Sequence, residues 1–448
     1  MSTQEQKGTN WVAVVTMMFI YGMISFVTNL AAPMGNVWKY QPGIDGSNMW
    51  GMMGNMMNFA AYLFMGIPAG RMLAKKGYKF TAMAGIATGF VGVAIQFLSG
   101  KVGLNADGTF AMAGGLPAAF FVYLLGAFVC GFAVCMLNMV VNPMLNLLGG
   151  GGNRGNQLNM IGTTFNSLAG TATPMLVGIL IGEVTKATKV ADVNMVLYIA
   201  LAVFAAAFVI LSFIPVPNPE QGDTAEDIPV LAPLKFRHCL LGVIGIFMYV
   251  GIEIGIPATM NLWLADANGP FKGTEFAAKA GAIGGVVAGT YWFLMLVGRT
   301  IGAFIGGKIS SRALMTFTTF TAIVLIIVGT QTTAISTKMP VFTGKGFEMT
   351  TVPLTALLFA LCGLMTSIMW PSTFNLATEK LGKYTAAASG LFMVMVVGGG
   401  VLPLVQNYIA DKAGFMISYV VPAVALAYLF VYSAFLSKPP ADIEERVK

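Results

Sequence analysis

The sequence predicts an all-α membrane protein that crosses the bilayer with twelve helices. Of its 448 residues, 56% are hydrophobic and only 10% are charged, which is too little charge for the water-facing surface of a soluble fold. The apolar residues gather in twelve segments of roughly 20 residues or more, the length that a helix needs to cross the hydrocarbon core. None of these segments shows the short alternating pattern of a membrane β-barrel strand.

The predicted spans follow one another with short polar connections. In chain order they cover residues 11–33, 48–69, 79–99, 117–146, 157–182, 194–214, 237–264, 280–306, 313–332, 352–376, 385–409 and 415–436. The first ten residues are polar and lack the pattern of a removable signal peptide, so we expect the first span to remain in the mature protein.

The most acidic connection divides the spans into two sets of six. It covers residues 215–236 and opens with the sequence Pro-Val-Pro-Asn-Pro. We therefore predict an N-terminal six-helix bundle over residues 1–214, a cytoplasmic linker over 215–236 and a C-terminal six-helix bundle over 237–448. Two six-helix halves joined by a polar linker are the layout of the major facilitator fold.

Basic residues set the predicted orientation. Fifteen Lys and Arg residues fall on the side that holds both termini, and nine fall on the opposite side, when Arg299 within the eighth span is left out. Cytoplasmic loops carry an excess of basic residues, so we expect both termini in the cytoplasm. The net charge of +7 then reflects membrane topology and not a nucleic-acid partner.

Amides interrupt the apolar sequence between residues 137 and 167. In a lipid-facing helix such groups cost several kcal/mol each unless they find a partner, so an uncharged polar ligand is expected to meet them. Asn138, Asn142 and Asn146 are spaced four apart and share one helical stripe. After a glycine run, Gln157, Asn159 and Asn166 follow.

Two further patterns lie on the second and eighth spans. Asn48, Asn55 and Asn58 share one face of the second span, where they either line a cavity or bond neighbouring helices. Glycines at 281, 285, 289, 298, 302 and 306 on the eighth span predict close helix packing, on a surface that is also suited to rocking.

Glu253 is the only carboxylate near the middle of a predicted span. An ionisable group at that depth is costly and marks a functional site by default. The sequence leaves open whether Glu253 takes up and releases protons, binds hydroxyl groups of a ligand or forms a structural bond between helices. For Arg299, near the cytoplasmic end of the eighth span, we expect pairing or snorkelling at a helix end.

Aromatic side chains near these amides suggest a sugar site, because sugars present apolar C–H faces as well as hydroxyls. The candidates are Tyr21, Tyr291, Trp292 and Trp370. Trp370 precedes Pro371, which we expect to break the tenth span within the membrane. Asn261 on the seventh span and Asn375 on the tenth add amides from the C-terminal half.

Four stretches resemble one known family. They are residues 68–79, residues 142–149 with 157–167, residues 237–256, and residues 367–376 continuing to 381–385 and 398–403. The sequence resembles the fucose–galactose–glucose permease group of the major facilitator superfamily, the family of bacterial L-fucose/proton symporters, over nearly its whole length. This resemblance implies sugar transport through the bacterial inner membrane, with proton symport.

The sequence departs from this family at two carboxylates that are proposed to bind protons and sugar there. The matching positions in the first and fourth spans are Asn29 and Asn138, and the family's amide in the fifth span is kept as Asn159. An amide can bind a hydroxyl but cannot titrate. Family membership therefore favours symport, whereas these residues favour a facilitator or sodium coupling.

The sequence as a whole predicts a transporter that moves a neutral hexose such as fucose, galactose or glucose across the inner membrane by alternating access. The alternatives are a sodium-coupled or uncoupled sugar uniporter and an exporter of another small organic solute. No nucleophile–base pair, metal cluster or phosphate loop indicates an enzyme, and no cofactor beyond a coupling H⁺ or Na⁺ is expected. We expect a monomer. The predicted substrate-binding residues are Asn29, Asn138, Asn142, Gln157, Asn159, Asn261, Tyr291, Trp370 and Asn375, and Glu253 is the candidate for proton coupling.

Overall fold

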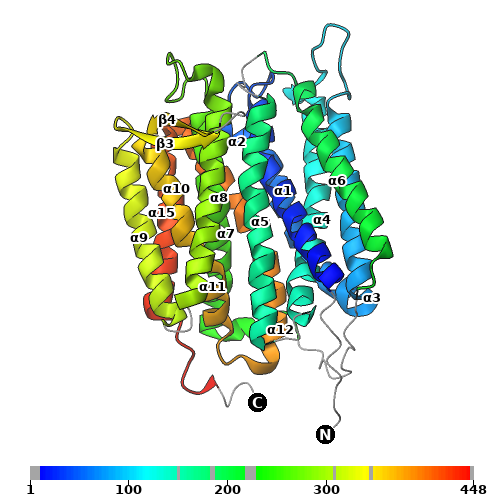
Figure 1. The fold of residues 1–448 in the computed structure, drawn as a ribbon, viewed down its shortest axis with the longest axis vertical. Coiled ribbons are helices and arrows are strands. Elements are labelled where there is room, and N and C mark those ends of the chain that lie inside the picture. Colours follow the sequence, from blue (N-terminus) through cyan, green and yellow to red (C-terminus); the bar gives the residue numbers. More distant parts are fainter. Residues whose placement is uncertain are drawn as a thin grey trace.

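The computed structural model describes residues 11–148, 152–181, 187–216, 229–305, 309–342 and 347–443. Long helices stand side by side and roughly parallel to the long axis of the molecule (Figure 1). The first helix begins at the lower end of this view, and the described chain finishes at the same end (Figure 1). This is the lower end of the molecule, and the opposite end is its upper end.

The N-terminal half contains six long helical segments. One of its helices is bent at Gly77, whose φ of 83° and ψ of 176° interrupt the helix and suit a residue without a Cβ. Its elements are α1 (Trp11–Lys39), α2 (Asn48–Gly51), α3 (Met53–Ser99), α4 (Ala118–Leu148), α5 (Gly152–Ile181), η1 (Val190–Val193) and α6 (Asn194–Phe213).

The C-terminal half repeats this arrangement with more broken helices. Its elements are η2 (Ala232–Lys235), α7 (Arg237–Leu264), η3 (Ala277–Lys279), α8 (Ala280–Ile305), α9 (Ser311–Gln331), α10 (Leu354–Thr366), α11 (Met369–Thr378), η4 (Gly382–Tyr384), α12 (Thr385–Met395), α13 (Gly398–Ala413), α14 (Phe415–Ser418), α15 (Val420–Val431) and η5 (Tyr432–Leu436). The tenth predicted span is interrupted between Thr366 and Met369, close to the break expected at Pro371. Pro371 itself lies in the first turn of α11, where a helix tolerates proline.

Strands occur only in the loops of the part of the chain that the structure describes. Strands β1 (Met112–Ala113) and β2 (Leu116–Pro117) form a short pair. Strands β3 (Ser336–Phe342) and β4 (Phe347–Pro353) form an antiparallel hairpin, with Ser336 opposite Pro353 and Phe342 opposite Phe347. This hairpin lies across the upper end of the bundle (Figure 1).

Eleven helical segments within the described ranges are long and apolar enough to cross a membrane. They match eleven of the twelve predicted spans. The remaining span, predicted at 48–69, is α2 with the first arm of α3; it is also helical, but Asn48, Asn55 and Asn58 reduce its hydropathy. The predicted all-α membrane fold is confirmed. The central part of the predicted linker, residues 217–228, lies outside the described residues.

The two halves pack closely along two pairs of helices. On one side α5 lies against α8, where a Cβ added to Gly285 would come 2.3 Å from the Pro174 carbonyl oxygen. On the other side α3 lies against α12 and α13, where a Cβ added to Gly400 would come 2.9 Å from Cβ of Phe59. Glycine at these positions allows the backbones of the two halves to approach.

Candidate functional site

A small central cavity lies between the two halves. Helices α1, α3 and α5 border it from the N-terminal half, and α7 and α8 border it from the C-terminal half. Its volume of about 20 Å³ is room for one or two water molecules, so the site is narrow in this conformation. The lining residues are Thr28, Asn29, Asn55, Pro174, Ile254, Pro257, Ala258, Asn261, Ala288 and Trp292.

Three amides reach this cavity from different helices. Asn29 on α1 is half-buried, and its Nδ2 donates to Ser25 O at 2.9 Å and to Ser25 Oγ at 3.2 Å. Asn55 Nδ2 on α3 donates across the halves to Gly399 O at 2.8 Å. Asn261 on α7 is 3% exposed, and its side chain makes no hydrogen bond to another described residue. The acceptor oxygen of Asn29 and both polar groups of Asn261 are thus available to a ligand.

Trp292 provides the apolar wall. Its indole is buried on α8 and lies against Gly170 of α5, where an added Cβ would come 3.1 Å from Trp292 Cδ2. Proline also lines the cavity on both sides, at Pro174 in α5 and Pro257 in α7. Each proline frees the carbonyl four residues earlier from its helical hydrogen bond, which leaves a backbone acceptor in the membrane interior.

Glu253 lies one turn below the cavity on α7, four residues before Pro257. Its Oε1 is 3.5 Å from Nη2 of Arg299 on α8, and the two side chains are 15% and 24% exposed. Arg299 Nη1 also donates to Ser167 Oγ at 3.1 Å and to Thr163 O at 3.4 Å, both on α5 of the opposite half. The pairing expected for Arg299 is therefore observed, and its partner is the one carboxylate predicted to lie in mid-membrane.

Two of the predicted site residues, Asn29 and Asn261, meet at the cavity. Three others lie elsewhere in the C-terminal half. The hydroxyl of Tyr291 is bonded to Thr366 Oγ1 at 2.9 Å, Trp370 is half-buried with its ring centroid 6.0 Å from that of Tyr249, and Asn375 is exposed on α11.

The remaining predicted amides come from α4 and α5. Asn138 Nδ2 donates to the hydroxyl of Tyr62 at 2.8 Å, and Asn138 does not line the central cavity. The side chains of Asn142, Gln157 and Asn159 lie outside the part of the structure that is described. Their roles stay predictions.

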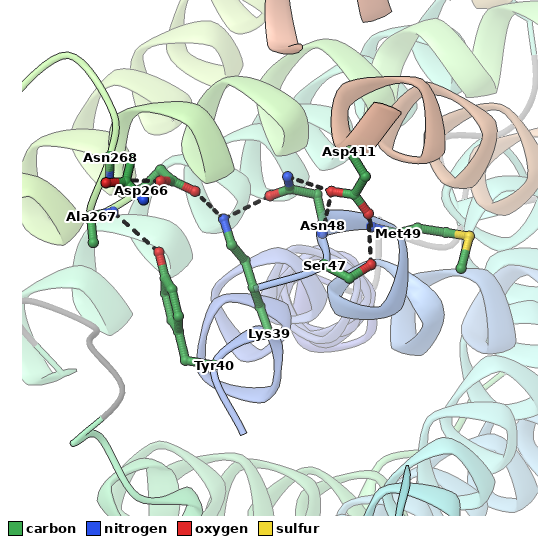
Figure 2. Close-up of polar contacts among 9 residues, drawn as sticks. All are labelled: Lys39, Tyr40, Ser47, Asn48, Met49, Asp266, Ala267, Asn268 and Asp411. Atoms are coloured by element: carbon green, nitrogen blue, oxygen red, sulfur yellow. Dashed lines mark hydrogen bonds and ion pairs between the residues drawn. The ribbon is translucent and has the colours of Figure 1, made fainter. Parts of the chain in front are cut away.

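Sequence reasoning missed a polar network at the upper end of the molecule. Lys39, the last residue of α1, is 1% exposed and pairs with Asp266 Oδ2, just after α7. Lys39 Nζ also donates to Asn48 Oδ1 at 2.7 Å. Asn48 Nδ2 in turn donates to Asp411 Oδ1 on α13 at 2.7 Å (Figure 2). The sequence had singled out Asn48 as an amide that could bond a neighbouring helix, but the three charged residues of the network stood out only as charges near the ends of predicted spans.

No metal centre is indicated: the described residues contain no group of three or more His, Cys, Asp or Glu side chains that would hold a metal ion. The central cavity is thus lined by uncharged hydrogen-bonding groups and one indole, and the Glu253–Arg299 ion pair lies beside it.

Comparison with known proteins shows which proteins the chain resembles in sequence and in fold. No family model matches the chain. A glucose/galactose transporter of Brucella abortus is 28% identical over 450 residues, which cover 98% of this chain and 96% of that protein. The L-fucose-proton symporter of Escherichia coli is 22% identical over 409 residues, covering 85% of this chain and 83% of that one. The crystal structure of a variant of the E. coli fucose:proton symporter matches 96% of this chain and 100% of its own, with a TM-score of 0.65 and 17% identity.

The chain has the all-α fold of these major facilitator structures, and its sequence is similar to sugar transporters over nearly its whole length. The resemblance that the four stretches indicated is confirmed, and its relatives are transporters and not enzymes. The central cavity lies between the two halves of this fold, where transporters of inverted-repeat architecture bind their substrates.

Proposed function

We propose that this protein moves a neutral hexose across the bacterial inner membrane by alternating access, as a monomer with both termini in the cytoplasm. The observation that carries the proposal is that Asn29 and Asn261, from opposite halves, line one cavity together with the indole of Trp292. A ligand that bonds both amides links the two halves, so its binding favours their joint movement.

The chemistry of this cavity suits a sugar. Amides both donate to and accept from hydroxyls, and the indole of Trp292 offers an apolar face to the C–H side of a pyranose ring. None of the ten lining residues is charged, which favours a neutral substrate. The glucose/galactose and fucose specificities named for the relatives support the same class of substrate.

The narrow cavity supports alternating access. With about 20 Å³ of space, the cavity does not admit a hexose until the halves move apart. Contacts across the halves lie above it at Lys39 and below it at Arg299, so entry from either end requires one of these contacts to open.

Proton symport is the coupling that the geometry favours. The Glu253–Arg299 pair contains a titratable group next to the cavity, and Arg299 connects it to α5 of the other half. Protonation of Glu253 removes its charge from Arg299, which changes the contact between the halves. Uncoupled or sodium-coupled transport remains the alternative, because Asn29 and Asn138 cannot titrate.

Sugar uptake into proteoliposomes tests the proposal directly. The purified protein in proteoliposomes is given labelled glucose, galactose or L-fucose, and uptake is compared with that of Asn261→Ala. We expect uptake of at least one of these sugars and a loss of roughly 5- to 30-fold in the variant, because one or two hydrogen bonds of about 1 kcal/mol each are removed. Asn105→Ala, at an exposed loop amide bonded to Thr109, is the matched control and should transport normally. Equal uptake by both variants, or no uptake of any hexose, would refute the hexose site.

A further inference from the structure

Lys39 is a lysine buried where two halves of the protein meet. Its side chain is 1% exposed, and its ammonium is shared between Asp266 of the C-terminal half and Asn48 of its own half. The ammonium also lies 5.8 Å from the ring centroid of Phe415, again in the C-terminal half. A lysine with so little exposure is stable only while these partners hold it.

Asp411 of α13 extends this contact on its other side. Its carboxylate accepts from the backbone N of Asn48 at 2.7 Å and of Met49 at 2.9 Å, and from Ser47 Oγ at 2.6 Å. It also accepts from Asn48 Nδ2, so Asn48 joins Lys39 to Asp411. Figure 2 shows the resulting chain, Asp266–Lys39–Asn48–Asp411, with C-terminal residues at both ends and N-terminal residues between them.

Close packing holds this chain in place. A Cβ added to Gly35 of α1 would come 2.3 Å from the Gly51 carbonyl oxygen of α2, so the two helix ends touch through their backbones. Next to Lys39, the hydroxyl of Tyr40 accepts from the backbone N of Ala267 at 3.1 Å and adds one more bond between the halves.

The chain of contacts lies directly above the central cavity. Asp266 follows Asn261 by five residues, and Lys39 follows Asn29 by ten residues, which correspond to about 8 Å and about 15 Å along a helix. A solute that enters from the upper end therefore has to pass the contacts of Lys39 with Asp266 and of Asn48 with Asp411.

We propose that Lys39, Asn48, Asp266 and Asp411 form a latch that closes the upper entrance to the cavity and opens once in each transport cycle. The two carboxylates hold the N-terminal half at separate points, so opening requires both the Lys39–Asp266 pair and the bonds of Asp411 to residues 47–49 to break. This inference deepens the alternating-access part of the proposed function and does not depend on which sugar is carried.

A thiol reporter in the cavity tests the latch. Ala258→Cys places a thiol on the cavity lining, and the four native cysteines, Cys130, Cys135, Cys239 and Cys362, are all buried. A membrane-impermeant methanethiosulfonate reagent is added outside intact cells, and the labelling rate is measured. Adding Lys39→Gln should raise the rate by about threefold or more. Lys272→Gln removes a lysine at the same end that bonds only Asn268 of its own loop, and should leave the rate unchanged.

Cross-linking provides a second readout that does not depend on Lys39. Asn48→Cys and Asp411→Cys are joined with a short thiol-specific cross-linker, which should reduce transport by at least tenfold and slow labelling of the cavity reporter. Reversal of the cross-link should restore both. The control pair Asn268→Cys and Lys272→Cys joins two positions within one loop and should leave transport unchanged.

The two measurements also separate this inference from the sugar assignment. Normal transport with the Asn48–Asp411 cross-link formed would overturn the latch, as would equal reporter labelling in Lys39→Gln and Lys272→Gln. Increased labelling in Lys39→Gln, in a protein that takes up none of the hexoses, would support the latch and refute the hexose assignment.

Discussion

Glu253 and Arg299 face each other at 3.5 Å in the middle of the C-terminal half, and the same guanidinium reaches Ser167 of the N-terminal half at 3.1 Å. A titratable carboxylate and a contact between the halves thus share one arginine. A change in the charge of Glu253 alters the electrostatic partner of Arg299, and Arg299 transmits that change to α5. This relationship is the physical basis of the coupling that we propose.

Replacement of Glu253 by Gln should abolish proton coupling, because an amide keeps the shape of the side chain but cannot take up a proton. The parent protein should make a weakly buffered medium more alkaline when sugar is added to de-energised cells. Glu253→Gln should exchange sugar across the membrane without this pH change and without uphill accumulation.

Glu379→Gln is the matched control for that variant. Glu379 also pairs with an arginine, Arg312 at 3.6 Å, but it is 42% exposed and lies outside the central cavity. It should retain the pH change. If the parent protein transports sugar with no pH change at all, the coupling is not to protons, and the sodium-coupled or uncoupled alternative replaces it.

Removal of the Ser167 hydroxyl should weaken the lower contact between the halves and leave the Glu253–Arg299 pair intact. Hydrogen bonds to charged groups contribute about 1.5–3 kcal/mol, so Ser167→Ala should shift the conformational equilibrium by roughly tenfold or more toward separated lower ends. A thiol reporter on the cavity lining should then react faster with a reagent supplied from the side on which the described chain begins and ends. Thr173→Val removes a hydroxyl that bonds only Ala169 within α5, and should not change this rate.

The sequence identified the helices that build the site and two amides that meet there. Asn29 stood out because it matches a carboxylate position of the resembling family, and Asn261 because it is an amide in an apolar helix, which needs a polar partner; both do line the cavity. The requirement that a buried amide have a polar partner does not say which partner the amide has in the fold. Asn138 satisfies it with the hydroxyl of Tyr62, a residue 76 positions away, and nothing in the local sequence indicates that bond.

The upper latch and the aromatic side of the cavity show two other features that the sequence alone could not predict. Lys39 and Asp266 are 227 residues apart. In the sequence each is interpreted as an isolated charge in a loop, because only the fold brings the two together. Tyr291 and Trp292 are neighbours that point about 100° apart around α8, and the rotation of that helix decides which one faces the cavity. Trp292 does, and Tyr291 bonds Thr366.

These neighbours give a prediction that separates a binding role from a structural one. Trp292→Ala should lower sugar affinity by roughly tenfold or more, because the apolar wall of the cavity is lost. Tyr291→Phe removes the bond to Thr366 and should cost about 0.5–1.5 kcal/mol of stability with little change in affinity. Calorimetric titration gives the affinity, and thermal unfolding gives the stability. A large loss of affinity in Tyr291→Phe with none in Trp292→Ala would assign the wall to Tyr291, another of the aromatic candidates from the sequence.

The glycines of α8 serve two different close contacts, one between the halves and one within the C-terminal half. Gly285 and Gly289 face α5 across the halves, whereas Gly298 and Gly302 face α10 and the residues that follow it in their own half. An alanine at 285 would place its Cβ 2.3 Å from the Pro174 oxygen, so the backbones have to separate. Overpacking of this kind costs about 1–3 kcal/mol, which exceeds the helix preference that alanine adds.

Gly285→Ala should therefore lower both the apparent melting temperature in detergent and the rate of transport, since Pro174 also lines the cavity. Gly390→Ala on α12 is the control, because its Cβ would meet nothing within 4 Å. There the better helix propensity of alanine should hold the melting temperature or raise it slightly. A melting temperature that rises equally in both variants would mean that α5 and α8 can move apart freely at this point, and the tight contact that we describe between the halves would not constrain them.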